Sequence, residues 1–416
     1  MLDIACDQVL FLLVLNKKEC LDKHIKSDAL VQNQMHFKKD KAMEPHNIVG
    51  NAEMENLREQ VMFNCHVSDG RYGGVFSLCG FLLRMRDFYK WEQGLNPWDD
   101  PDYPDLLQWV ENKEKMWEKT AMEEFRPLAL DDRSLDPFDV DEVNAGIMPS
   151  GLFYGAGYAT GMKPTFFLAS TSTFKTINNM HIHILDKELA RDLFTSPAIR
   201  QGNHIIIRPW TMAALLWDLI LEKKPSTLEA LKYALAQFDL DLDNLRRFPE
   251  KLGNGLWQVA REESETLVYH EMGEALQEEF DLGIWQELVA YHANTIVEKT
   301  ARAVKDLLAD THEQGLLAHI IEQKKKSSLG LYLCFATPIS KVFFPEIAQG
   351  FEWIKRGNDW NVLEEIRQKG YLKGKKLAGK LMHYHLEGQS RGNDWVRSRV
   401  ETELIEPMGV NIEEDE

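Results

Sequence analysis

The stretch GLWQVAREESETLVYHEMGEALQEEF, residues 255–280, decides which fold the second half of the chain adopts. Its apolar residues recur at helical spacing, which predicts a long amphipathic helix over residues 256–280. The apolar face of this helix consists of Leu256, Ala260, Leu267, Val268 and Ala275. Such a face has to pack against other elements of the protein core.

Several polar residues of this helix fall on the wrong side for solvent exposure. Glu263, His270, Glu271, Glu274 and Glu278 lie inside or at the edge of the apolar arc. Glu263, His270 and Glu274 are spaced by seven and four residues, so they form one line along the helix. A carboxylate in a protein core is costly unless it is paired, protonated or bound to a metal. The helix therefore predicts a polar site in the interior.

The segment that follows offers partners for these side chains. A short connection, DLG at residues 281–283, leads to a second predicted helix over residues 284–310, which folds back on the first. Beside its apolar face runs a polar stripe of His292, Thr295, Lys299, Arg302, Asp306 and Asp310. We therefore expect the two helices to enclose Glu263, His270, Glu271, Glu274, His292, Lys299 and Asp306.

One interpretation of this cluster is catalytic. The sequence HEMGE (270–274) differs from the zinc-binding pattern H-E-x-x-H by having Glu274 in place of the second histidine. A divalent iron, manganese or zinc ion would be held by Glu263, His270, Glu274, His292 and Asp306. Glu271 would then serve as the base, with Lys299 as a second catalytic group. This interpretation predicts a metal-dependent enzyme whose reaction is unknown.

Two other interpretations stay open. In the first, the stripes are structural ion pairs between helices, joining Glu271 or Glu274 to Lys299 or Arg302, and the protein is a non-catalytic interaction or regulatory protein. In the second, a small molecule binds at the glycine-rich turn YGAGYATGMKP (154–164), although a plain β-turn explains those glycines as well.

The rest of the chain predicts an α+β, mainly helical protein in two parts. An α+β domain is expected over residues 54–222, with strands at 151–159, 164–174, 180–187 and 204–209, a short helix at 188–199 and a loop at 127–150. Ser68 or Asp69 would cap the helix that follows them. A helical domain is expected over residues 223–388. Residues 1–53 are expected to form a poorly ordered extension and residues 389–416 an acidic tail.

Composition narrows the classes of function. The 416 residues carry a formal net charge of -18, which disfavours binding to nucleic acid backbones and anionic membranes. No apolar run is long enough to span a membrane. The five cysteines are irregularly spaced without a C-x-x-C pair, which indicates reduced thiols and a cytoplasmic location. Cys65 and His66 are adjacent, and we interpret Cys65 as a buried, unreactive thiol.

Several stretches resemble a bacterial family of unknown function over roughly residues 54–388. They are NCHVSDGRYGGVFSLCGFLLRMRDFYKWEQG (64–94), GLFYGAGYATGMKPTFFLAS (151–170), ELARDLFTSPAIRQGNHIIIRPWTMAALLWDLI (188–220), VYHEMGEA (268–275) and ARAVKDLLADTHEQGLLAHII (301–321). The resemblance implies family membership and a soluble bacterial protein, and it implies nothing about chemistry.

Overall fold

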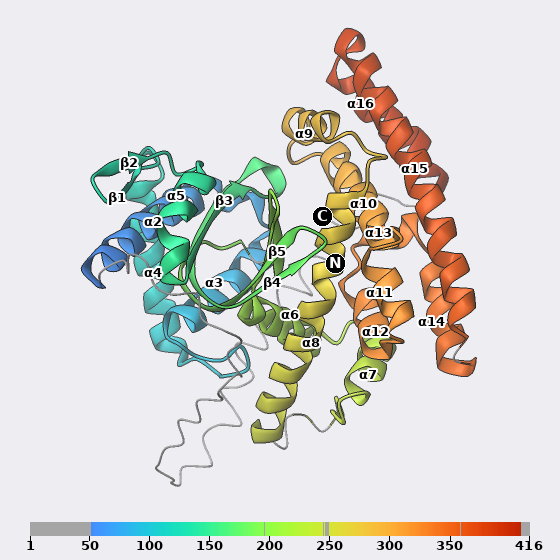
Figure 1. Cartoon of the computed structure of the whole chain (residues 1–416), viewed down its shortest axis with the longest axis horizontal. Helices are drawn as coiled ribbons and strands as arrows, with labels where there is room; N and C mark the ends of the chain where they lie inside the picture. Colours follow the sequence, from blue (N-terminus) through green and yellow to red (C-terminus); the bar gives the residue numbers. More distant parts are fainter. Residues whose placement is uncertain (1–50, 195, 244, 246–248, 358, 409–416) are drawn as a thin grey trace.

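The computed structural model describes residues 51–408, except residues 195, 244, 246–248 and 358. It confirms the expected α+β, mainly helical class. Figure 1 shows a curled sheet with its helices on one side and a helical region on the other, with α8 between them. Most of the expected N-terminal extension, residues 1–53, lies outside the described residues, as does the end of the chain from residue 409.

The N-terminal region surrounds one five-stranded sheet. The strand order is β3-β4-β5-β7-β6, and every neighbouring pair is antiparallel except β5 and β7, which are parallel. Its helices are α2 (Asn51–Tyr72), α3 (Leu78–Glu92), α4 (Tyr103–Thr120) and α5 (Val140–Ile147). Its strands are β1 (Leu128–Leu130), β2 (Arg133–Leu135), β3 (Leu152–Tyr158), β4 (Pro164–Ile177), β5 (Met180–Arg191), β6 (Ala198–Gln201) and β7 (His204–Ile207).

Three local expectations in this region are corrected by the structure. Residues 188–191 continue strand β5 instead of forming a helix, because they pair with β4 as far as Phe167 opposite Arg191. The expected loop at 127–150 contains the β1–β2 hairpin and α5. Ser68 and Asp69 lie inside α2 and cap nothing, whereas the next helix, α3, is capped by Ser77, whose side chain accepts from the Gly80 N–H. Tertiary pairing overrides local propensity in each case.

The helical region holds the largest apolar core of the described chain. Its helices are α6 (Pro209–Glu222), α7 (Leu228–Ala236), α8 (Pro249–Leu276), α9 (Leu282–Tyr291), α10 (Ile296–Thr311), α11 (Leu316–Glu322), α12 (Lys326–Phe335), α13 (Pro338–Phe343), α14 (Glu346–Gly357), α15 (Trp360–Arg391) and α16 (Asn393–Val400). Helix α6, expected in the first domain, packs into this core through Met212 and Leu216. Residues 389–400, expected in a tail, form the end of α15 and α16, and Val396 is buried.

The two helices expected over 256–280 and 284–310 differ in two respects from the observed ones. The first is a single helix, α8, which starts earlier and ends at Leu276. The second is divided into α9 and α10 by a turn in which Asn294 has a left-handed backbone with φ of 61°. Helices α8 and α10 approach closely at Gly273, where a Cβ atom would clash with the backbone carbonyl of Ala309.

Two features join the sheet to the helical region. Ile182, Ile205 and Ile207 of the sheet share an apolar cluster with Val268 and Met272 of α8. The fully buried Glu298 carboxylate of α10 accepts the backbone N–H of Gly161 at 2.9 Å, and also that of Asn294 and Nε of Arg302. Both an apolar contact and a buried polar one therefore hold the regions together.

The described helices were compared with the length and hydropathy of membrane-spanning helices. None of the helices within residues 51–408 combines the length and the apolar character that a bilayer crossing requires.

Candidate functional site

The structure brings several of the expected residues to one cavity of about 240 Å³. Helix α8 supplies Glu263, His270 and Glu271, and α10 supplies Asp306 and Asp310. Ser328 and Tyr332 of α12 close the same space, with apolar residues and the Ser196–Ala198 segment beside β6. The cavity thus lies where the sheet region meets the helical region.

An ion pair between His270 and Asp310 forms part of the cavity wall. Nδ1 of His270 lies 2.7 Å from Oδ1 of Asp310, which also interacts with the hydroxyl of Tyr332. Burial disfavours the imidazolium, but the charge and hydrogen bond of Asp310 outweigh it and hold the pKa of His270 well above its usual value. His270 is therefore protonated and positively charged at neutral pH.

Glu271 and Glu274 form a pair of unlike carboxyl groups. Burial, together with the neighbouring charge of Glu274, raises the pKa of Glu271 to about 7, although the charge of His270 opposes this. Glu274 is bound by Nζ of Lys305, which outweighs its own burial and lowers its pKa. Glu271 is thus the carboxyl that holds the proton of its hydrogen bond with Glu274, which is ionised.

Two further carboxyl groups that line the cavity, Glu263 and Asp306, also have raised pKa values. Burial raises the pKa of Glu263 to about 7, even though its Oε1 accepts the hydroxyls of Ser328 at 2.9 Å and Ser327 at 3.3 Å. Burial, with repulsion from Asp310, raises the pKa of Asp306 to about 6. Both groups change protonation state easily at physiological pH.

Three of the expected residues, Glu274, His292 and Lys299, do not line the cavity. Glu274 pairs with Lys305 behind the wall. His292 is the buried C-cap of α9, beside His385, and Lys299 is exposed to solvent. The turn between α9 and α10 breaks the helical spacing that would have aligned His292 with Asp306, so the polar stripe is not continuous.

Sequence reasoning missed other residues of the site. Lys305, rather than Lys299 or Arg302, is the cation that pairs with Glu274. Asp310 belongs to the predicted polar stripe, but the sequence does not indicate its pairing with His270. Ser328 and Tyr332 come from α12, and no sequence signal linked that segment to the cluster.

The predicted metal ligands are not arranged around a common point. Within the described residues, no group of three or more His, Cys, Asp or Glu side chains is arranged to hold a metal ion. The physical reason lies in their partners, because His270 faces Asp310 and Glu274 is bound by Lys305. Glu263, in turn, is bound by two serine hydroxyls.

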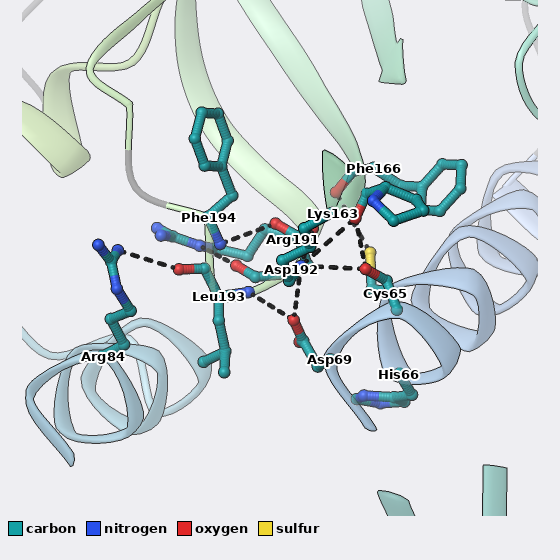
Figure 2. A network of polar contacts seen from close by, with 12 residues as sticks. Cys65, His66, Asp69, Arg84, Lys163, Phe166, Arg191, Asp192, Leu193 and Phe194 are labelled. Carbon is teal, nitrogen blue, oxygen red and sulfur yellow. Dashed lines mark hydrogen bonds and ion pairs between the residues drawn. The ribbon is translucent and has the colours of Figure 1, made fainter. Parts of the chain in front are cut away.

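A second buried polar network lies in the N-terminal region and is shown in Figure 2. Nζ of Lys163 lies 3.1 Å from Oδ1 of Asp69 and 2.9 Å from Oδ2 of Asp192, and it also bonds Ser68. Burial opposes its charge, but the two aspartates outweigh this and raise the pKa of Lys163. A lysine held in this way is no base, so the network fastens α2 to the sheet.

Cys65 and the glycine-rich turn also have structural contacts. The Cys65 thiol donates to the carbonyl of Phe166 at 3.2 Å, and burial raises its pKa, as expected for an unreactive cysteine. In the turn, a Cβ atom at Gly161 would clash with the side chain of Asn294, and one at Gly155 would clash with the ring of Phe167. Both glycines therefore serve close packing.

Comparison with known proteins places the chain in a family. Residues 56–208 match the N-terminal domain, and residues 213–403 the C-terminal domain, of a family of unknown function (DUF6866). The chain belongs to this family, which confirms the membership that the sequence indicated. No curated protein and no solved structure matches the chain.

Proposed function

We propose that this member of the DUF6866 family is an enzyme that moves protons to and from a small organic molecule bound in the α8–α10–α12 cavity. The observation that carries the proposal is the position of Glu271 in the cavity wall, next to the charged pair of His270 and Asp310. Strongly perturbed carboxyl groups that line a cavity are typical of acid–base catalysis.

The surroundings of each group suggest its role. Glu271, with a pKa of about 7, is populated both as an acid and as a base at neutral pH, which is the condition for efficient proton transfer. His270 is held in its charged form by Asp310, so it is suited to stabilising negative charge that develops on a substrate rather than to accepting a proton. Asp306, with a pKa of about 6, is a second proton acceptor in the same wall.

This proposal retains the base role of Glu271 that the sequence predicted. It replaces the predicted metal ligands and the catalytic role of Lys299. The metal-dependent version would require His270 and Glu274 to leave Asp310 and Lys305. The observed pairing therefore favours a mechanism in which side chains alone handle the protons. Lys299, which is exposed, has no role in it.

A comparison of matched variants tests the proposal. The wild-type protein, Glu271→Gln and Glu265→Gln would each be incubated with a mixture of small metabolites, and consumption followed by mass spectrometry. Glu265 is exposed on the same helix and serves as the control. We expect at least one compound to be consumed by the wild type and the control, with a rate about 100-fold lower for Glu271→Gln. Equal rates in all three proteins would refute the role of Glu271.

A non-catalytic interaction or regulatory protein is the second candidate function. The ion pair of Glu274 with Lys305 and the serine contacts of Glu263 favour it, because both satisfy polar groups without any ligand. In that case no metabolite is consumed by the wild type, and Glu271→Gln leaves the binding of protein partners unchanged.

A further inference from the structure

Three histidines form a cluster on the face of the sheet that is turned away from α8. His181 and His183 belong to β5 and His204 to β7, and in this parallel strand pair His181 lies opposite His204. Nε2 of His183 lies 2.8 Å from Nδ1 of His204, and the centroids of the two rings are 5.1 Å apart. The ring of His181 lies 5.2 Å from that of His204. The three imidazoles are therefore in mutual contact.

The side chains around this histidine cluster are mainly aromatic. The ring centroid of Phe153, on β3, lies 4.6 Å from that of His183, and Phe174 of β4 lies 5.3 Å from it. His183 is only 3% exposed. Among the residues that the structure describes, no aspartate or glutamate forms an ion pair with any histidine of the cluster. Nothing next to these rings compensates a positive charge.

The charged residues of the adjacent elements do not change this environment. Lys175 of β4 and Arg200 of β6 are paired with Ile182 and Ile205, so both project from the opposite face of the sheet, which packs against α8. Asp141 of α5 favours the charged form of His204, but burial outweighs it and the pKa of His204 is lowered.

The contact between His183 and His204 is compatible with neutral rings and not with two charged ones. A neutral imidazole has one N–H donor and one acceptor nitrogen, so one ring donates to the other. An imidazolium has two donors and no acceptor, so charging both rings breaks the hydrogen bond and leaves two cations in a buried contact. Burial, with the charges of His204 and His181, accordingly lowers the pKa of His183 to about 4.

The cluster lies at the strand pair that joins the β6–β7 hairpin to the rest of the sheet. Strand β7 pairs with β5 on one side and with β6, which is at the sheet edge, on the other. Ala198 of β6, with Ser196 and Pro197 before it, lines the α8–α10–α12 cavity. A change in the β5–β7 pairing therefore reaches a segment that closes this cavity.

We propose that His181, His183 and His204 form an acid-sensitive switch, which keeps the β6–β7 hairpin paired with β5 at neutral pH and weakens this pairing as the pH falls. A histidine in an open chain binds its proton near pH 6.5, whereas His183 and His204 bind theirs at lower pH when the strands are paired. The stabilisation by the neutral cluster is thus fully present above about pH 6.5 and is lost as the pH falls towards 4. The inference holds whether or not the cavity is catalytic.

Hydrogen exchange of the full chain, followed by mass spectrometry at pH 7 and pH 5 and corrected for the intrinsic exchange rate, tests the switch. Peptides that cover residues 181–184 and 204–207 report on the β5–β7 pair, and α14, which contains no histidine, is the reference. A single group whose pKa falls from 6.5 to about 4 on pairing lowers protection by more than about tenfold between these pH values. We therefore expect protection of the strand pair to fall at least about tenfold more than that of α14.

A double variant separates the charge of the cluster from its shape. In His183→Gln/His204→Asn, the glutamine amide nitrogen takes the place of the Nε2 donor and the asparagine oxygen that of the Nδ1 acceptor, so a hydrogen bond is kept without a titrating ring. We expect the fall in protection to shrink to less than about threefold. His383→Gln, at an exposed position of α15, is the matched control and should respond to acid as the wild type does.

Equal protection of the strand pair at pH 7 and pH 5 in the wild type would overturn the inference. A loss of protection in acid that persists in the double variant would also overturn it, because another group must then be responsible. If the double variant does not fold, an NMR titration of the wild-type histidines decides, and a pKa of His183 at or above 6.5 contradicts the switch. The metabolite assay at pH 7 is independent of all these outcomes.

Discussion

Replacing Glu263 by glutamine should stabilise the protein at alkaline pH and much less at acidic pH. Glu263 is buried in α8, and its pKa is raised from 4.5 to about 7. The folded protein therefore binds this proton more tightly than the unfolded chain does. Stability is greatest below the unfolded pKa and is lost as the pH rises towards 7, because the folded protein must then hold a buried charge. Glutamine keeps the shape and an oxygen for the two serine hydroxyls but carries no charge.

The size of the stability change follows from the raised pKa of Glu263. Integrated from pH 5 to pH 8, a pKa that rises from 4.5 to about 7 costs the wild-type protein on the order of 2.5 kcal/mol of stability. Glu263→Gln removes that loss. The free energy of unfolding of the variant, relative to the wild type, should therefore increase by about 2.5 kcal/mol between these two pH values.

Urea unfolding of the full chain at pH 5 and pH 8, followed by circular dichroism, measures this difference. All other titrating groups cancel between the variant and the wild type. Glu265→Gln, at an exposed position two residues away, is the control, and we expect it to change stability by less than about 0.5 kcal/mol at both pH values. A Glu263→Gln effect that is the same at pH 5 and pH 8 would show that folding does not raise the pKa of Glu263.

Three further substitutions test other parts of the structure. Asp310→Asn should lower the pKa of His270, because burial is then opposed only by the weaker charges of Glu271 and Asp306. An imidazole pKa that is unchanged in an NMR titration would contradict this. Lys163→Met should lower the free energy of unfolding by about 3–5 kcal/mol, because the buried Asp69 and Asp192 lose their cation. An unchanged Tm in calorimetry would show that these ion pairs do not stabilise the fold. Gly273→Ala should lower the free energy of unfolding in urea by about 1–3 kcal/mol, because the added methyl group meets the carbonyl of Ala309. An unchanged free energy of unfolding would mean that α8 and α10 can move apart without cost.

The sequence predicted the part of the site that lies on one continuous helix. Glu263, His270 and Glu271 reach the same cavity because their spacing in α8 places them on one side of a regular helix. Prediction failed for His292 because a turn with left-handed Asn294 resets the helical phase before Asp306. A single non-glycine residue with positive φ is difficult to predict from a sequence.

The pairing of charges was harder to predict than their burial. Ser68 and Asp69 resemble helix caps locally, yet their partner is Lys163, which is nearly a hundred residues away in the chain. No local pattern distinguishes Lys305, which pairs with Glu274, from Lys299 of the same helix. Long-range pairs of this kind depend on how elements pack, and no local pattern encodes them.

The apolar cluster shared by the sheet and α8 has a consequence for producing either half of the chain alone. Ile205 belongs to the N-terminal family domain, whereas Val268 and Met272, which it joins, belong to the C-terminal one. Neither half can be copied into another gene without exposing side chains that the other half now covers. The two halves should therefore stay soluble only when they are produced together. Either half made alone that stays monodisperse would contradict this.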